Sequence, residues 1–274
     1  MTPETESHAP SKLVSVIIPI YTLDMTPRER AALRQALTVL KAHDIVVVTP
    51  VGLDLSSLPG WLGMDACWRQ ECFAESFFAG REGYNRLMTS AEFYERFLDS
   101  EFVLVCQTDV WIFSDSLREW CQTGYDYIGA PWLPNPKAVK GFYPIHRLEF
   151  LIKRLCHSYS TSLKYKVGNG GFSLRRTGKF AELARRHAAE IASLRQNEHG
   201  IKSFEDVIWS KAVNEWQPGA LLIAPWDVAL RFSVEGHVGY ALSLLEGDLP
   251  MGTHAYSRFK NRGHWQGHIP PEAF

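Results

Sequence analysis

Residues Phe102–Asp109 read FVLVCQTD, and this short stretch decides the fold. Its run of apolar residues ends abruptly on the polar triplet Gln107-Thr108-Asp109. Such a short run predicts a strand that is buried on both faces of a parallel sheet. In open α/β sheets, ligands bind just beyond the carboxyl ends of strands, so a carboxylate there can hold a divalent cation against a diphosphate. The alternative, about equally favoured by this stretch alone, is that Asp109 only caps a turn.

The residues before this stretch predict a βαβ unit. Residues 13–21 (LVSVIIPIY) form a β-branched strand, and Thr26-Pro27 opens a helix with Thr as its N-cap and Pro in the first turn. Residues 44–50 (DIVVVTP) form a second strand. Two strands joined through one helix predict a parallel pair with a right-handed crossover, and hence an α/β fold.

Further elements are predicted along the rest of the chain. Residues 83–98 read as one helix, residues 125–129 as a strand, and Thr177 as the cap of a later helix. Ser203 opens another helix, and residues 228–233 form a late strand. Ser203 with an acid three residues later nearly matches a capping box.

Composition narrows the class of protein. The chain has 274 residues, is 46% hydrophobic and 22% charged, and has a formal net charge of −1, which is typical of a soluble globular protein and gives no sign of nucleic-acid binding. Residues 1–12 are polar, and we expect a flexible tail rather than a signal peptide. The five cysteines contain no C-x-x-C pair, so free thiols in a reducing cytoplasm are expected.

Residues 137–166 interrupt the pattern with a basic segment. Glu149 is its only acid, and aromatic and aliphatic residues are interleaved with seven basic ones: Lys137, Lys140, Arg147, Lys153, Arg154, Lys164 and Lys166. A solvated basic insertion is one interpretation. The other is a flap that meets an anionic acceptor or a membrane surface.

Four features could carry chemistry, and each is weak alone. They are Asp109, a glycine loop at residues 168–171, the pair Glu205-Asp206, and His254. The alternative is that the acidic pair only stabilises the amino terminus of a helix through the helix dipole. Taken together, Asp109 and His254 could share Mn²⁺ or Mg²⁺, the glycines could let backbone approach a sugar, and a carboxylate could accept the proton of an attacking hydroxyl.

The sequence resembles glycosyltransferases of the GT-A fold. The similarity is carried by VSVIIPIY, CQTD, YDYIGAPW, VGNGGFSLRR, FEDVIW and GTHAY. It is closest to a bacterial, glycosyltransferase-like family of unknown function, for which YDYIGAPW and VGNGGFSLR are the most specific stretches. The resemblance implies a GT-A-like α/β fold with a Rossmann-type half and a mainly parallel sheet. It also implies one domain over residues 13–274, in which residues 13–132 bind the nucleotide sugar and residues 133–274 bind the acceptor and carry catalysis.

The resemblance also implies roles for individual residues. Donor binding falls on Pro19, Tyr21, Asn85, Gln107, Thr108 and Asp109. Acceptor binding falls on Trp132, Asn169, Gly170 and Gly171, metal binding on Asp109 and His254, and catalysis on Asp206 as the base with Glu205 beside it. Gln107 stands where the family's Asp-x-Asp motif has its first Asp, so we expect only moderate affinity for Mn²⁺ or Mg²⁺. Because the helix dipole favours the charged form, Asp206 is expected to be ionised at neutral pH.

The implied function is transfer of a sugar, by a hexosyltransferase-type inverting reaction, from a nucleotide diphosphate donor to a hydroxyl acceptor. A UDP-sugar donor is favoured, and a saccharide or lipid-linked acceptor would place the protein in cell-envelope polysaccharide or glycolipid synthesis. The expected location is the cytoplasm, with peripheral contact to the inner membrane through residues 137–166. Two alternatives remain, a nucleotidyltransferase and a non-catalytic carbohydrate- or nucleotide-binding protein on the same fold.

Overall fold

The computed structural model describes residues 10–63, 67–136, 163–197 and 203–274. Most of the predicted tail and of the basic segment 137–166 therefore lie outside the described residues. The strands are β1 (Lys12–Pro19), β2 (Asp44–Pro50), β3 (Arg69–Phe73), β4 (Ser100–Cys106), β5 (Val110–Ile112), β6 (Tyr127–Gly129), β7 (Phe172–Arg176), β8 (Ser233–Val234) and β9 (Gly252–His254).

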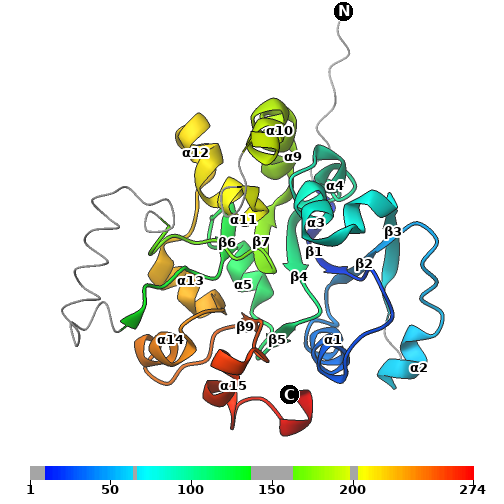
Figure 1. The fold of residues 1–274 in the computed structure, drawn as a ribbon, viewed down its shortest axis with the longest axis vertical. Coiled ribbons are helices and arrows are strands. Elements are labelled where there is room, and N and C mark those ends of the chain that lie inside the picture. The colour runs from blue at the N-terminus through cyan, green and yellow to red at the C-terminus, as the bar shows by residue number, and fades with distance from the viewer. Residues whose placement is uncertain (1–9, 64–66, 137–162, 198–202) are drawn as a thin grey trace, which may run out of the picture.

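Helices cover both faces of the main sheet (Figure 1). They are α1 (Pro27–Val39), α2 (Leu58–Leu62), α3 (Gly80–Met88), α4 (Ala91–Glu95), α5 (Leu117–Cys121), α9 (Thr177–Arg186), α10 (Ala188–Asn197), α11 (Glu205–Val207), α12 (Val213–Trp216), α13 (Trp226–Phe232), α14 (Val238–Leu244) and α15 (Phe259–Trp265). A π-helix, η3 (Ile208–Ala212), links α11 to α12, and short 3₁₀ turns lie at η1 (Glu75–Phe78) and η4 (Pro271–Ala273).

The main sheet is mostly parallel, as predicted. Its strand order is β3-β2-β1-β4-β7-β6, and β3, β2, β1 and β4 run parallel to one another. Strand β7 is antiparallel to both β4 and β6, so the prediction that β4 has parallel neighbours holds on one side only. The chain leaves β1 toward β2 on one side and later returns to β4 on the other. This change of direction creates the crevice where ligands bind in such sheets.

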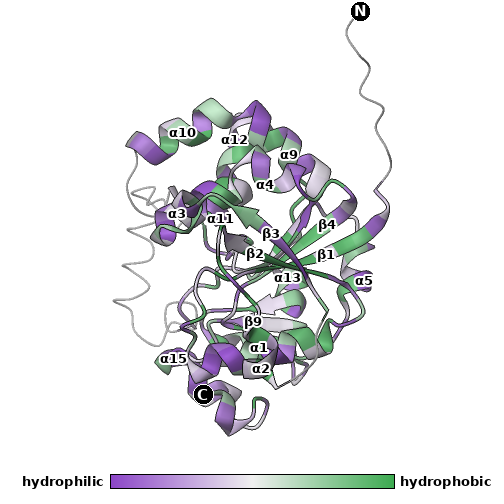
Figure 2. Cartoon of the chain, turned by 90° about the vertical axis from the view of Figure 1, so that its right-hand side faces the viewer, coloured by the Kyte–Doolittle hydropathy of each residue, from purple (hydrophilic) through white to green (hydrophobic). Residues whose placement is uncertain are grey.

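The prediction that β4 is buried on both faces is confirmed. Phe102, Leu104 and Cys106 pack into the core that also contains residues of α1 and α2. The alternate residues Val103 and Val105 pack against α3, α4 and α9. Figure 2 shows the same pattern, with hydrophobic strands between helices whose outer surfaces are hydrophilic. Because both faces need apolar residues, β4 reads as a continuous apolar run.

The first βαβ unit forms as its sequence predicts. The Thr26 hydroxyl accepts a hydrogen bond from the Glu29 backbone N–H, and the Glu29 carboxylate accepts one from the Thr26 N–H, which is a complete capping box. Ala32, Leu33, Ala36 and Leu37 of α1 are buried.

Four local predictions are wrong. Residues 83–98 form two helices, because the Ser90 hydroxyl accepts from the Phe93 N–H and starts α4. Residues 226–232 form helix α13, so β8 covers only the last residue of the predicted strand 228–233 and Val234. The last two concern caps. Thr177 is already helical, and its hydroxyl has no hydrogen-bond partner among the described residues. The residue directly before α11 is Phe204 rather than Ser203.

A second, smaller sheet has the order β5-β9-β8. In it Val110 pairs with His254, and the Ala255 N–H donates to the Asp109 carbonyl at 3.0 Å. This pairing brings the carboxyl-terminal His254 beside the end of β4. Within the described residues, no helix is long and apolar enough to span a membrane.

Candidate active site

The sequence-predicted residues Asp109, Gln107 and His254 meet at one point beyond the end of β4. His254 Nε2 lies 3.0 Å from Asp109 Oδ1 and 3.1 Å from Gln107 Oε1. Gln107 and Asp109 directly follow strand β4, and His254 is the last residue of β9. A buried imidazole therefore faces one carboxylate and one amide oxygen.

Glu235 is a fourth member of this cluster that the sequence analysis did not identify. Its Oε2 lies 3.1 Å from Nδ1 of His254, and its Oε1 lies 3.4 Å from Arg258. Glu235 directly follows β8, and its one sequence signal was an acid at a strand end.

The charges of this cluster shift one another's pKa values. Burial by itself would lower the pKa of His254, but Asp109 and Glu235 raise it to about 10. Burial would likewise raise the pKa of Asp109, and His254 lowers it instead. Asp109 is thus held as a carboxylate next to His254. A cation bound between the two side chains would have to displace a proton from the imidazole, because only a neutral imidazole nitrogen binds a metal.

The chemistry of the donor set fits Mn²⁺ or Mg²⁺. Carboxylate and amide oxygens with one imidazole nitrogen suit Mn²⁺, and a carboxylate behind the imidazole, here Glu235, is the usual partner that orients a metal-binding histidine. Among the described residues, no group of three or more His, Cys, Asp and Glu side chains could hold a metal ion. A cation at this point would have only Asp109 and His254 as ligands of these types, with the neutral Gln107 oxygen as a third.

The acidic pair lies at the start of α11 with its two side chains in different environments. Glu205 is buried, and its Oε2 pairs with Arg175 at 3.0 Å. The Asp206 carboxylate is partly buried, and its Oδ1 accepts from the Val207 N–H at 2.8 Å. Burial, with Glu205 and Glu235 next in effect, raises the pKa of Asp206 to about 7. The pKa of Asp206 is therefore raised, opposite to the direction expected from the helix dipole.

Arg175 is a second residue that sequence reasoning missed. It is fully buried and contacts Tyr94 Oη at 2.8 Å and the Gly170 carbonyl at 3.3 Å, besides Glu205. Asn85, predicted to bind the donor, is also buried here, where its Oδ1 accepts from the Glu205 N–H at 3.2 Å. These contacts fix Glu205.

The glycine loop makes room for the side chains of the site. A Cβ at Gly171 would lie 2.5 Å from the His254 ring and 2.7 Å from Gln107 Oε1. A Cβ at Gly170 would lie 1.6 Å from Glu205 Oε1, and one at Gly168 would overlap the Trp132 ring at 1.9 Å. The loop was predicted to let backbone approach a sugar. In the structure it lets the chain's own side chains approach the backbone.

The remaining predicted residues surround this point. Asn169, in the left-handed region at φ 54°, accepts from the Trp132 indole N–H at 3.0 Å and donates to the Ala130 carbonyl. Pro19 is buried within β1, whereas Tyr21 is 58% exposed. Partial burial of the phenol oxygen, followed by the charges of Glu29 and Asp109, raises the pKa of Tyr21. Thr108 lies in the turn between Gln107 and Asp109.

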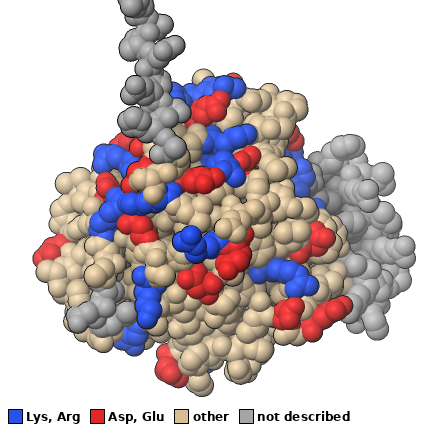
Figure 3. All heavy atoms as spheres, turned by 180° about the vertical axis from the view of Figure 1, so that it is seen from behind, with Lys and Arg blue, Asp and Glu red and all other residues tan. Residues whose placement is uncertain are grey.

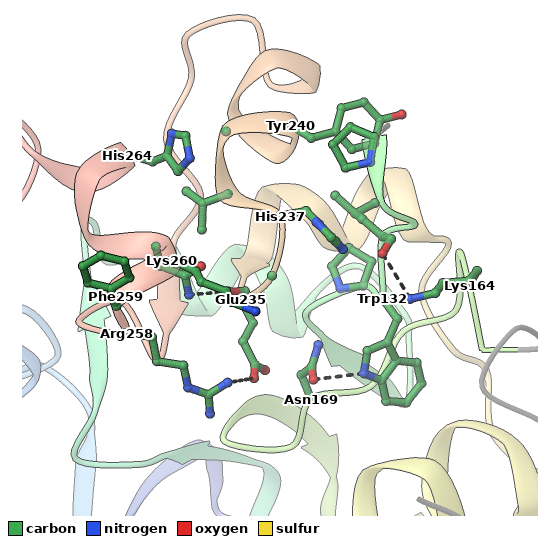
Figure 4. Close-up of a pocket in the computed structure, with 17 residues that line it drawn as sticks. Trp132, Lys164, Asn169, Glu235, His237, Tyr240, Arg258, Phe259, Lys260 and His264 are labelled. Atoms are coloured by element: carbon green, nitrogen blue, oxygen red, sulfur yellow. Dashed lines mark hydrogen bonds and ion pairs between the residues drawn. The ribbon is translucent and has the colours of Figure 1, made fainter. Parts of the chain in front are cut away.

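A cavity of about 1060 Å³ adjoins the site and shares Trp132, Asn169 and Glu235 with it. In Figure 4 the labelled side chains surround this space, with Trp132 and Asn169 on one side and Arg258 with Glu235 on the other. The sequence did not predict the cavity, because its walls come from the β6–β7 connection, α14 and α15. Such a space, next to acidic and metal-type ligands, is typical of a substrate site.

Solved structures with the same fold are glycosyltransferases. Galactosyltransferase LgtC, solved with donor and acceptor sugar analogues, is 14% identical with a TM-score of 0.55, over 94% of this chain and 98% of that one. Mouse xyloside xylosyltransferase 1 is 10% identical with a TM-score of 0.53, over 91% and 98%. GlyE of Streptococcus pneumoniae TIGR4 is 12% identical with a TM-score of 0.51; the match covers 96% of this chain but only 62% of GlyE.

These likenesses confirm the GT-A-like fold. No curated protein matches the sequence. The model of one family does match, over residues 68–254, and its description is "Protein of unknown function (DUF5672)". This match covers most of the chain, including the end of β4, the glycine loop, the acidic pair and His254, and so the chain belongs to the DUF5672 family.

Proposed function

We propose that the protein is a glycosyltransferase that moves a sugar from a nucleotide diphosphate, with a UDP-sugar favoured, to a hydroxyl group of a saccharide or lipid-linked acceptor. The observation that carries this proposal is the meeting of Asp109, His254 and the Glu205-Asp206 pair at one edge of the sheet, beside a cavity. LgtC, which shares the fold, binds donor and acceptor sugar analogues.

The donor is assigned to the crevice between β1 and β4. Tyr21 is exposed there for contact with the base, and Gln107, Thr108 and Asp109 face the diphosphate. Mn²⁺ or Mg²⁺, held by Asp109 and His254, would supply positive charge against the leaving diphosphate. Glu235 keeps the His254 ring turned toward Asp109.

Asp206 is assigned as the general base. Its carboxylate accepts the proton of the acceptor hydroxyl while that oxygen bonds to the anomeric carbon of the donor sugar. The bond from this carbon to the diphosphate oxygen breaks, and the diphosphate leaves with its electron pair. A single displacement of this kind inverts the anomeric configuration. A base with a pKa near 7 is well matched to neutral pH.

Glu205 is assigned to orientation rather than proton transfer. Arg175 and Asn85 hold it, and its buried position leaves Asp206 as the more accessible acid. Trp132 and Asn169, joined by their hydrogen bond, are assigned to the acceptor, together with Gly170 and Gly171.

The wider setting is also part of the proposal. Residues 13–274 act as one domain, with donor and acceptor halves that divide near residue 132. The basic segment 137–166 meets an anionic acceptor or the inner membrane surface from the cytoplasmic side, in cell-envelope polysaccharide or glycolipid synthesis.

The test is Asp206→Asn, with Asp248→Asn as the matched control because the Asp248 side chain is 70% exposed and pairs only with Arg231 among the described residues. Loss of a positioned base should lower kcat ~10²–10⁴-fold with donor affinity nearly unchanged. Wild-type kcat should rise with pH through about 7, following ionisation of Asp206. The control should keep wild-type kinetics.

Other outcomes point elsewhere. Binding of nucleotide sugars without any transfer by the wild type would favour a non-catalytic binding protein, and incorporation of nucleoside monophosphate would favour a nucleotidyltransferase. A product with retained anomeric configuration would exclude the single displacement.

A further inference from the structure

The cavity beside the active site is lined with positive charge. Among the described residues that line it, Glu235 is the one acid, whereas five have basic side chains: Lys164, His237, Arg258, Lys260 and His264. Glu235 is already engaged by His254 and Arg258. On the face behind Figure 1, by contrast, basic and acidic side chains are intermixed (Figure 3). With Glu235 and Arg258 paired, Lys164 and Lys260 leave the described part of the cavity with an excess of positive charge.

Lys164, His237 and Lys260 form no ion pair with any residue that the structure describes. Burial, followed by repulsion from the charges of Lys164 and Lys260, lowers the pKa of His237. The two lysines are thus close enough to disfavour a positive charge on His237. Burial also lowers the pKa of Lys164, whose one described hydrogen bond is to the Leu133 carbonyl at 3.5 Å. Like charges gathered in a partly desolvated cavity destabilise the fold unless a ligand neutralises them.

The backbone around the cavity is strained at the residues that present this charge. His237 has φ 52°, and Tyr165, next to Lys164, has φ 60°. A non-glycine residue in this region costs of order 1 kcal/mol, and such strain is concentrated at functional sites. The surrounding fold therefore holds the backbone at Lys164 and His237 in place.

Aromatic side chains complete the wall. Phe259 is 97% exposed although it lines the cavity, and Tyr240 and Trp132 line it as well. A nearly fully exposed Phe side chain does not contribute to the core, but its ring offers an apolar face to a sugar. Aromatic faces with a few polar groups are the usual lining of ligand sites.

We infer that this cavity binds the acceptor, and that the acceptor is a saccharide carrying a phosphate or carboxylate group held by Lys164, His237 and Lys260. The inference rests on the proposed function. It adds a substrate class: a negatively charged acceptor, with its sugar against the aromatic wall of the cavity and its reacting end toward Asn169 and Glu235, which the cavity shares with the active site.

The experiment is calorimetric titration of the metal-loaded protein with glucose, glucose 6-phosphate and glucuronate, and separately with UDP. Variants are Lys164→Gln and Lys260→Gln, with Lys41→Gln as the matched control because Lys41 is exposed and lies outside the cavity. Glucose 6-phosphate and glucuronate should bind at least ~10-fold more tightly than glucose, since each charged hydrogen bond contributes about that factor. Lys164→Gln should remove ~10-fold of that affinity and leave UDP binding within about three-fold. The control should change neither.

Two kinds of result overturn the inference: a missing effect of charge, and competition with the donor. Equal affinity for glucose and the charged sugars, or no effect of Lys164→Gln, would exclude an anionic acceptor. If UDP competes with glucose 6-phosphate and both variants weaken the two ligands equally, the anionic group in the cavity belongs to the donor. Both results are obtained without turnover, so they are distinct from failure of the proposed function, which would show as no nucleotide-sugar binding or no transfer by the wild type.

Discussion

Asp206 shows how burial overrides a local electrostatic rule. At the residue level, the start of a helix favours an ionised carboxylate. In the folded protein, α11 is a single short turn, and the Asp206 carboxylate lies near Glu205 and Glu235 in a poorly solvated place. Desolvation and two neighbouring acids outweigh the helix terminus and bring the pKa to about 7.

This shift predicts that Asp206 makes the fold less stable as the pH rises. The pKa is about 7 in the folded protein and ~3.9 in an unfolded chain, so folding holds the proton more tightly. Stability is unaffected below ~4, falls as the pH rises from ~4 to 7, and is constant above that. Asp206→Asn should therefore raise the free energy of unfolding by up to ~4 kcal/mol at pH 8 and by clearly less at pH 5.

Denaturant unfolding of the two proteins at both pH values measures the effect. A pure capping role for Asp206 predicts the opposite, a loss of ~0.5–2 kcal/mol in the variant. The same result at pH 5 and pH 8 would show that the carboxylate has an ordinary pKa.

At the level of elements, the loop before β7 is what lets the site form. β7 runs antiparallel to β4, so its first residues lie beside the last residues of β4, and the Gln107 N–H donates to the Gly171 carbonyl at 2.9 Å. His254 and Glu205 then press against Gly171 and Gly170 from separate segments of the chain.

Gly171→Ala should disturb the site because its Cβ would lie 2.5 Å from the His254 ring. Overpacking of this kind costs ~1–3 kcal/mol, and we expect lower Mn²⁺-dependent nucleotide affinity as well. Gly178→Ala in α9 is the matched control, since nothing lies within 4 Å of its added Cβ. It should be neutral or stabilise by up to ~1 kcal/mol through helix propensity. Equal thermal stability and nucleotide affinity in the two variants would contradict this account of the loop.

For the whole molecule, the metal-type ligands come from segments far apart in the sequence. Gln107 and Asp109 follow β4, and His254 comes from β9 near the carboxyl end, supported by Glu235 after β8. A ligand bound at this point should therefore contact residues of both sheets and stabilise the whole folded protein.

A thermal-shift titration with UDP tests this assembly. In Mn²⁺, UDP at 100-fold its Kd should stabilise the wild type by ~2.7 kcal/mol, and the shift should be much smaller in EDTA. Asp109→Asn and His254→Ala should each reduce the Mn²⁺-dependent part, with Asp115→Asn as a control on the other side of β5. Equal UDP shifts and equal turnover in EDTA and in Mn²⁺ would show that no metal acts there. Gln107 contributes no charge, so we expect moderate Mn²⁺ affinity.

The sequence by itself determined the elements whose signals are local. The apolar run of β4 is buried on both faces, and Thr26-Pro27 with Glu29 starts α1, because burial periodicity and capping depend only on neighbouring residues. The placement of Asp109 at a strand end followed from the same patterns. Its sharing of a metal ion with His254 was a hypothesis from combining four weak features, and the family resemblance implied the same pair. Their shared site is confirmed as a geometry and remains a prediction as a function.

Only the tertiary structure decided what depends on distant contacts. The roles of Glu235 and Arg175, the pKa of Asp206 and the positively charged cavity all arise where segments separated by tens to more than a hundred residues come together. Residues 228–233 look like a strand in isolation, but all except Ser233 belong to α13, because tertiary packing outweighs β propensity in so short a segment. Burial and the distances between charges are properties of the folded chain, and no local pattern in the sequence encodes them.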